Sequence, residues 1–328
     1  MVSELLAVQR QTRIAVPGAL FTAARVPPFP IHGEDDRRIN LRERIGEAPE
    51  PTVYISPFAT GLRFFLEAQL ADILGDVEVG SSDRAWAAHR ALQFLVGDIL
   101  HTGRTGIDVR AALATLRLVA RFVLEVGAAP VLAQLGPQPS PAGHAVSTAV
   151  YSLALAATDG RADLDWLAAV GLAGLTADLG KVDFANAVDH SGALTLDQWA
   201  TIRRHPQRSL EILREGRGVT PAPTLRGILG HHERWDGSGY PGELIAEAIP
   251  YEARVVGIAD AFTAITADRP HRPGADLFEA LTAMTSTPGL FDPRLMRGFI
   301  LLLGTQAGDE PPAATSMPAS ASMERTSA

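Results

Sequence analysis

The sequence predicts a mainly α-helical protein with a smaller N-terminal region of mixed or α/β character. Apolar residues recur at helical spacing through residues 142–303, where only short turn-like gaps interrupt the pattern. A similar helical pattern runs through residues 58–126. Before it, Arg13–Phe21 and Pro51–Ser56 are apolar runs typical of short strands. We therefore expect a helical C-terminal bundle that is preceded by short strands and further helices.

Proline marks the expected division of the chain. Residues 137–141 read PQPSP, which interrupts both helix and strand and predicts a domain boundary. We expect residues 1–136 to form an N-terminal regulatory or partner-docking region, and residues 142–303 to form the second domain. From residue 304 the chain is rich in Pro, Ala, Ser and Thr and has no apolar periodicity. Residues 304–328 are therefore predicted to be disordered.

Composition excludes several classes of function. The 328 residues carry a net charge of −8 and no long Lys/Arg cluster, so DNA is not an expected partner. The absence of cysteine excludes disulfides and thiolate nucleophiles, and it fits a reducing cytoplasm. The N-terminus lacks the pattern of a signal peptide, and Arg117 and Arg121 interrupt the apolar stretch Ala111–Val126. No stretch reaches the ~20 apolar residues of a membrane span, so we expect a cytoplasmic protein without a membrane partner.

Histidine and aspartate recur near helix ends and on apolar helix faces of the second half. The candidates are His144, Asp178, His205, His231, His232 and Asp260. Asp260 is the only charged residue between Arg254 and Asp268, beside an apolar stripe. A buried carboxylate needs a cation or hydrogen-bond donors. Taken alone, however, an exposed Asp on a polar helix face is the simpler interpretation.

The adjacent pair His231–His232 is a second candidate. Neighbouring residues on a helix point about 100° apart, so both imidazoles can reach one centre only near a helix end. The following residues, Asp236-Gly-Ser-Gly-Tyr-Pro, form turns and end the helix there. Two imidazoles with carboxylates from elsewhere suit a first-row divalent metal. The alternative for the isolated pair is two solvent-facing histidines.

Together these segments resemble the HD-GYP family of metal-dependent phosphohydrolases. The resemblance is carried by HHERWDGSGYP at 231–241, IPYEARVVGIADAFTAITADRP at 249–270 and FDPRLMRGF at 291–299. Order and spacing are kept from about residue 144 to residue 303. The resemblance implies an all-helical domain that holds divalent ions, often iron or manganese, and that hydrolyses cyclic di-GMP to the linear dinucleotide and in some members to GMP.

The resemblance also implies residue roles. The implied metal ligands are His144, Asp178, His205, His231, His232 and Asp260. Asp178 would be catalytic by bridging two ions, and Lys181 would be catalytic by holding the bridging water or a substrate phosphate. Lys181, Tyr240, Arg269 and Arg272 would bind the substrate. Arg is well suited to a planar contact with phosphate.

Three positions depart from the family pattern. Ala177 stands where the His of the His-Asp pair is expected, so one metal site lacks a ligand. We therefore expect one or two bound ions. Ser140 stands where some members carry a Glu for a third ion, and His271 replaces the Tyr of an Arg-Pro-Tyr sequence. One site keeps four ligands, while the other keeps His144, Asp178 and Asp260.

Two functions remain open from the sequence. One is a working phosphodiesterase on cyclic di-GMP, weakened by the missing ligand. The other is a catalytically inactive domain that binds a cyclic dinucleotide or a protein such as a diguanylate cyclase (GGDEF) domain. A general HD nucleotidase is less favoured, because the GYP turn indicates the cyclic dinucleotide branch. We predict weak or no hydrolysis of cyclic di-GMP, restored by Ala177→His.

Overall fold

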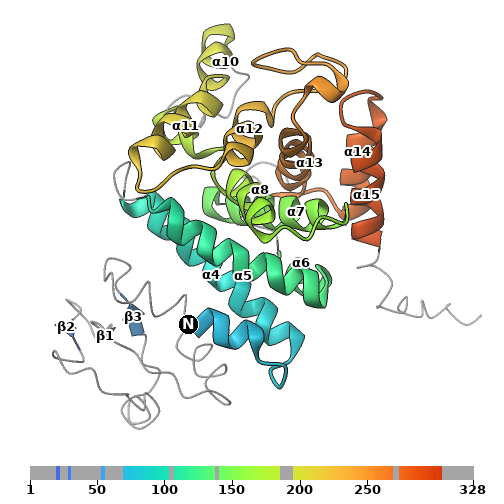
Figure 1. The fold of residues 1–328 in the computed structure, drawn as a ribbon. Helices are drawn as coiled ribbons and strands as arrows, with labels where there is room; N and C mark the ends of the chain where they lie inside the picture. The colour runs from blue at the N-terminus through green and yellow to red at the C-terminus, as the bar shows by residue number, and fades with distance from the viewer. Residues whose placement is uncertain are drawn as a thin grey trace, which may run out of the picture.

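The computed structural model describes residues 20–22, 29–30, 53–55, 69–102, 107–136, 140–184, 195–268 and 273–304 (Figure 1). The strands come first: β1 (Leu20–Thr22), β2 (Phe29–Pro30) and β3 (Val53–Ile55). They form an antiparallel sheet in the order β2-β1-β3, in which Phe21 lies opposite Pro30 on one side and Tyr54 on the other. The expectation of short strands is confirmed, since β3 lies inside the predicted run at 51–56 and β1 overlaps the end of the run at 13–21.

The rest of the described chain is helical apart from its turns and loops. After a helical stretch at residues 69–75 come α4 (Ser81–Thr102), α5 (Val109–Val126), α6 (Ala129–Leu132), α7 (Pro141–Ala157) and α8 (Leu164–Thr176). They are followed by η1 (Leu179–Phe184), α10 (Leu196–Ile202), α11 (His205–Glu215), α12 (Ala222–Gly230), η2 (Ala246–Ala248), α13 (Tyr251–Thr266), α14 (Leu277–Ser286) and α15 (Pro293–Gly304). Between residues 142 and 303, the described part contains no strand, and only the isolated bridges Asp236–Ile245 and Asp108–Arg217 involve residues of this range, so the predicted mainly α fold is confirmed.

Short polar side chains fix where several helices begin. The Asp163 carboxylate accepts hydrogen bonds from the first backbone N–H groups of α8. Thr195 and Gln198 cap α10 reciprocally, each side chain accepting from the other residue's backbone N–H. Pro141 begins α7, where its missing N–H would have had no partner in the helix. These local signals set where α7, α8 and α10 begin. The candidate ligand His144 lies in the first turn of α7.

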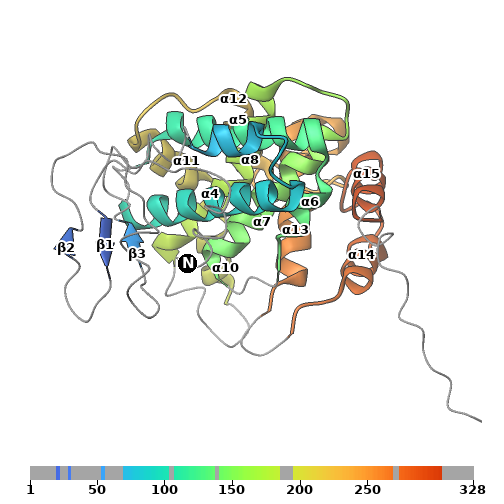
Figure 2. The ribbon, with the colours of Figure 1, turned by 90° about the horizontal axis from the view of Figure 1, so that it is seen from below.

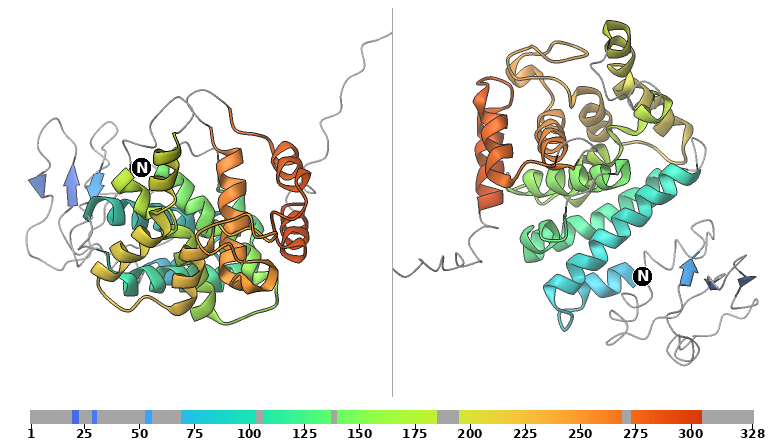
Figure 3. Two further views of the ribbon diagram at one scale, coloured as in Figure 1. Left: turned by 90° about the horizontal axis from the view of Figure 1, so that it is seen from above. Right: turned by 180° about the vertical axis from the view of Figure 1, so that it is seen from behind.

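The helices α7 and α8 lie at the centre of the bundle. Figure 1 shows α4 and α5 on one side of this pair and α11, α12 and α13 on the other, while Figures 2 and 3 place α14 and α15 beside α13 at one edge. Close packing of α7 on α8 depends on Gly174, because a Cβ there would lie 2.9 Å from the Cα of Ala149.

One hydrophobic core runs through both halves of the described chain. It includes Leu92 on α4, Leu116 on α5, Leu172 on α8 and Phe299 on α15, all of which are almost completely buried. The helices before and after residues 137–141 therefore stabilise each other, and the domain boundary placed there stays a prediction. Of the helices that the structure describes, none is long and apolar enough to cross a bilayer.

Candidate metal centre

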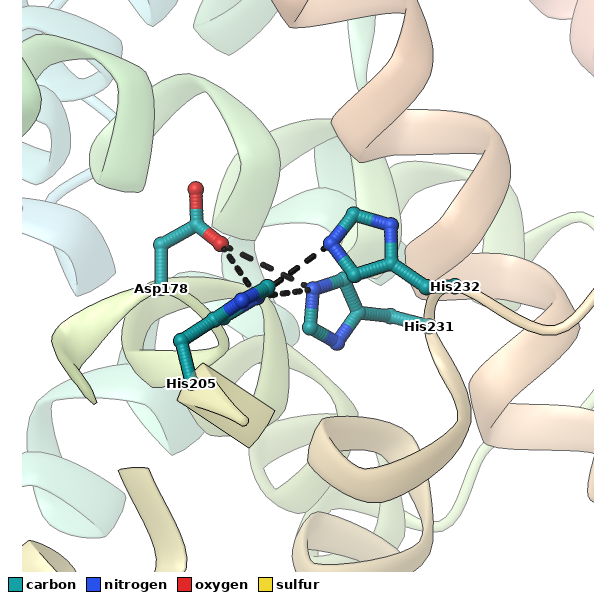
Figure 4. A group of neighbouring side chains, drawn as sticks. All are labelled: Asp178, His205, His231 and His232. Atoms are coloured by element: carbon teal, nitrogen blue, oxygen red, sulfur yellow. Dashed lines mark hydrogen bonds and ion pairs between the residues drawn. The ribbon is translucent and has the colours of Figure 1, made fainter. Parts of the chain in front are cut away.

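Three helix ends bring four predicted ligands together. Asp178 follows the end of α8, His205 is the first residue of α11, and His231 and His232 directly follow α12. The side chains point toward one centre from these separate elements (Figure 4). One ligand atom from each of the four residues lies within 4.8 Å of the others. Their convergence was expected from the sequence, and their role as metal ligands stays a prediction.

The imidazoles of this first group meet through their Nε2 atoms. Nε2 of His205 lies 3.2 Å from Nε2 of His231 and 3.2 Å from Nε2 of His232. Oδ1 of Asp178 lies 3.2 Å from Nε2 of His205 and 3.6 Å from Nε2 of His231. Three ring nitrogens and one carboxylate oxygen thus face a single point.

In two of the imidazole rings, a hydrogen bond at Nδ1 determines whether Nε2 faces the common point with a proton or with a lone pair. Nδ1 of His205 lies 2.7 Å from the carbonyl oxygen of Ile202, and Nδ1 of His231 lies 2.7 Å from that of Ile228. A carbonyl only accepts, so each Nδ1 carries a proton, and Nε2 of the corresponding neutral ring presents a lone pair. Lone pairs that face each other at 3.2 Å have no hydrogen between them, and a cation between them turns this repulsion into binding. The same outer hydrogen bond is typical of metal-bound histidine.

Asp178 provides a second indication that a cation fits. Its Oδ1 is buried and accepts no hydrogen bond of good geometry from the described residues. An unpaired buried carboxylate oxygen is costly, and a divalent ion removes that cost. The donor set of three imidazoles and one carboxylate therefore fits a first-row divalent metal.

A second donor group shares Asp178. Nε2 of His144, from the first turn of α7, lies 2.9 Å from Oδ1 of Asp260 on α13 and 3.4 Å from Oδ2 of Asp178. One ligand atom from each of these three residues lies within 4.8 Å of the others. Asp178 thus turns Oδ1 toward the first group and Oδ2 toward the second, which is the arrangement expected of a bridging carboxylate.

The second group balances its charges without a metal. Burial alone raises the pKa of Asp178, but the ammonium of Lys181 and contacts with the imidazoles outweigh it and hold that pKa well below its usual range. Burial and the charge of Asp178 raise the pKa of Asp260, yet His144 keeps it below its usual value. Burial lowers the pKa of His144, but the two carboxylates raise it to about 9. Lys181 and protonated His144 therefore oppose the two carboxylates, and a metal ion bound here would displace the proton of His144.

Ala177 lies next to Asp178, is 2% exposed and belongs to the hydrophobic core. Its carbonyl accepts a hydrogen bond from Oγ of Ser209 at 2.7 Å, and the same Oγ accepts from the backbone N–H of Gly180 at 2.8 Å. Ser209 thus ties the Asp178 turn to α11, which carries His205. Sequence reasoning missed Gly180 and Ser209, because their role depends on contact between segments about 30 residues apart.

The predicted substrate residues differ in what the structure shows. Nζ of Lys181 donates to Oδ2 of Asp178 at 2.5 Å. The ring of Tyr240 stacks on that of His232, with centroids 4.7 Å apart. Burial and the charge of Asp178 raise the pKa of Tyr240, so its phenol stays neutral and can donate a hydrogen bond. Arg269 and Arg272 lie outside the described residues.

Comparison with known proteins identifies the family of the chain. The model of the family described as HD domain matches residues 128–295, about half of the chain. The chain belongs to the HD domain family. It is 39% identical over 135 residues to the cyclic di-GMP phosphodiesterase PA4108 of Pseudomonas aeruginosa, a match that covers 41% of this chain and 32% of that protein. It is 40% identical over 129 residues to the cyclic di-GMP phosphodiesterase response regulator RpfG of Xanthomonas campestris, covering 37% and 34%.

A further curated relative of this HD domain protein is also named as a phosphodiesterase. The 3'3'-cGAMP-specific phosphodiesterase 3 of Vibrio cholerae is 34% identical over 150 residues, covering 44% of this chain and 31% of that protein. The matched segment thus spans about a third of the length of these curated relatives. The structure of Bd1817, a HDG"Y"P protein from Bdellovibrio bacteriovorus, aligns with a TM-score of 0.62 and 15% identity over 90% of this chain and 96% of that one. That likeness concerns the fold alone. Together with the family match and the curated relatives, it confirms the resemblance to the HD-GYP branch.

Proposed function

We propose that this protein is an HD-GYP-type, metal-dependent phosphodiesterase that acts on cyclic di-GMP or a related cyclic dinucleotide. The observation that carries the proposal is the convergence of three imidazole Nε2 atoms and the buried Oδ1 of Asp178, which has no hydrogen-bond partner among the described residues, on one point. The printed names of the relatives supply the substrate class. Those relatives are matched over about a third of their length, so the activity of this chain rests on the experiment below.

The two donor groups suit different ions. His205, His231 and His232 with Oδ1 of Asp178 offer a nitrogen-rich set, for which we propose iron or manganese. The second group offers one imidazole and two carboxylates, because Ala177 adds no ligand atom. We expect the first group to hold its ion more firmly than the second, so the protein carries one or two ions.

The residues around the centre have distinct parts in hydrolysis. Bound divalent ions supply the Lewis acidity that activates water and polarises a phosphate. Asp178 contributes Oδ1 to the first donor group and Oδ2 to the second, and so joins the two groups. Lys181, which lies beside Oδ2 of Asp178, is placed to hold the water or a phosphate oxygen, and the neutral phenol of Tyr240 can donate to the substrate. Arg269 and Arg272 are proposed further substrate contacts.

Weak hydrolysis is the expected outcome, because the second group lacks one nitrogen donor. Losing even a residue that only orients a ligand typically lowers metal affinity about 10- to 100-fold, so losing a ligand should matter more. The inactive binding domain is not favoured, because both donor groups are assembled in one place. A GGDEF domain partner and a cytoplasmic location stay predictions.

The decisive assay uses the full chain, purified without oxygen and supplied with Fe²⁺ or Mn²⁺. Cyclic di-GMP and 3'3'-cGAMP are incubated separately, and products are separated by liquid chromatography with mass detection. We expect slow formation of the linear dinucleotide, which a chelator and Asp178→Asn abolish. Asp165→Asn is the matched control, because this exposed carboxylate lies at the start of the same helix α8. Metal-loaded native protein that forms no product from either compound would refute the proposal.

A further inference from the structure

Arg203 is an arginine at the edge of the metal centre that forms no ion pair with an acidic side chain of the described residues. It directly follows α10 and precedes the proposed ligand His205 by two residues. Its side chain is exposed, and its guanidinium carbon lies 4.9 Å from the centroid of the Tyr240 ring. Within the part of the chain that the structure describes, this stack is the contact that Arg203 makes, and no carboxylate or carbonyl occupies its N–H groups.

Two other arginines, Arg208 and Arg234, use guanidinium donors in contacts within the fold. Arg208 pairs with Asp183 and Glu211. Nη1 of Arg234 donates to the carbonyl oxygens of His231 and Glu233. Structural arginines of this kind stabilise the fold. Arg203 differs because the Tyr240 ring contacts its flat face, while no acceptor in the described segments occupies its N–H donors.

This geometry suits an anion that approaches the metal centre. A guanidinium stacked on an aromatic ring keeps its N–H fork available for phosphate, and the stack reduces the freedom lost on binding. The same Tyr240 ring stacks on His232, so Arg203 lies beside the predicted substrate contact and close to the proposed ligands. On α10, Trp199 lies four residues before Arg203, which places both on one face of the helix. Trp199 is 48% exposed and offers a surface on which a base can stack.

We propose that Arg203 binds the phosphate of the cyclic dinucleotide that is not being cleaved, and that Tyr240 holds the guanidinium in position. The inference rests on the proposed function. A cyclic dinucleotide carries two phosphates, and only one can occupy the metal centre beside Lys181. The second must be held by a donor at the rim. Arg203 meets that requirement with N–H groups that no carboxylate or carbonyl of the described residues occupies.

The test compares Arg203→Ala with Arg204→Ala in the metal-loaded full chain. Arg204 is the matched control, since it is the neighbouring exposed arginine and makes no stack on Tyr240. Steady-state kinetics with cyclic di-GMP and binding of its non-hydrolysable phosphorothioate analogue are measured. We expect Arg203→Ala to raise KM and Kd about tenfold, the loss of one charge-assisted hydrogen bond, with a much smaller change in kcat. Arg203→Lys should recover part of the affinity, because it restores the charge without the planar fork.

Metal content is the readout that separates substrate binding from a structural effect. All three variants should retain the native number of ions per chain. Arg203→Ala with the KM and Kd of Arg204→Ala would overturn the inference, as would a loss of metal or of kcat with unchanged KM. If native protein neither binds nor hydrolyses a cyclic dinucleotide, the proposed function itself fails and this inference fails with it. If the native protein is active but Arg203→Ala leaves KM and Kd unchanged, the inference about Arg203 fails and the proposed function stands.

Discussion

Gly180→Ala should move Asp178 away from His205 and so disrupt the first donor group. Gly180 lies in η1, two residues after Asp178, and packs against the start of α11. A Cβ at this position would lie 2.4 Å from the carbonyl oxygen of His205 and 2.7 Å from the backbone nitrogen of Ser209. Both are backbone atoms, so no side-chain rotation can relieve the contact. The substitution must push η1 and α11 apart.

The size of that displacement decides its consequence. An ordinary contact begins at 3.4 Å, so η1 and α11 must separate by about 1 Å. Metal–ligand distances tolerate only about ±0.2 Å. The shift acts on the two segments that carry Asp178 and His205, whose ligand atoms lie 3.2 Å apart. We expect the first donor group to lose its ion, and overpacking to lower the free energy of unfolding by about 1–3 kcal/mol.

The assay measures ions per chain by mass spectrometry and unfolding by urea, with and without a chelator. Gly97→Ala is the matched control, because Gly97 lies inside α4 and a Cβ there meets nothing within 4 Å. That substitution should keep the metal and raise the unfolding free energy by up to about 1 kcal/mol. Native metal content in Gly180→Ala would refute the idea that close approach at Gly180 positions the ligands.

Three further outcomes follow from the structure. Ala177→His should raise both the number of ions per chain and the rate of cyclic di-GMP hydrolysis; no gain of either would show that the second site has decayed beyond this residue. Leu116→Ala should cost about 2–5 kcal/mol and should shift a single unfolding transition, because α5 shares its core with α8; two separate transitions would contradict the continuous core. Hydrogen bonds from Arg226 and Trp166 hold the pKa of Glu252 below its usual value against burial, so Glu252→Gln should lower stability at pH 7. That loss should shrink below about pH 4.5, where an unfolded Glu is protonated, and an equal loss at pH 3 in urea unfolding would argue against it.

The helical bundle and the composition of the site could be predicted from the sequence. Periodic apolar residues indicate helices directly, and Asp260 lies beside an apolar stripe, although an exposed Asp is the simpler interpretation of that residue alone. The resemblance to the HD-GYP family supplies Asp178. His231 and His232 are followed by a turn, which correctly indicates a helix end. Each of these signals is local, so it survives without knowledge of the fold.

The features that hold the site in place could not be read from the sequence. Ser209 joins the Asp178 turn to α11, and Gly180 permits that approach, but both depend on segments far apart in the chain. The stack of Arg203 on Tyr240 also joins separate elements. The sequence also does not show that helices on both sides of residues 137–141 share one core, because burial is decided by packing and not by the composition of the connecting segment. The domain boundary predicted there stays a prediction.

The metal content of the native chain, purified without oxygen and dialysed, tests the account most directly. We predict that one ion per chain is retained at the nitrogen-rich group of His205, His231, His232 and Asp178. A second ion should bind only when excess Fe²⁺ or Mn²⁺ is supplied, and His231→Ala should lose the retained ion. Folded native protein that holds no ion, even with excess metal, would contradict the account.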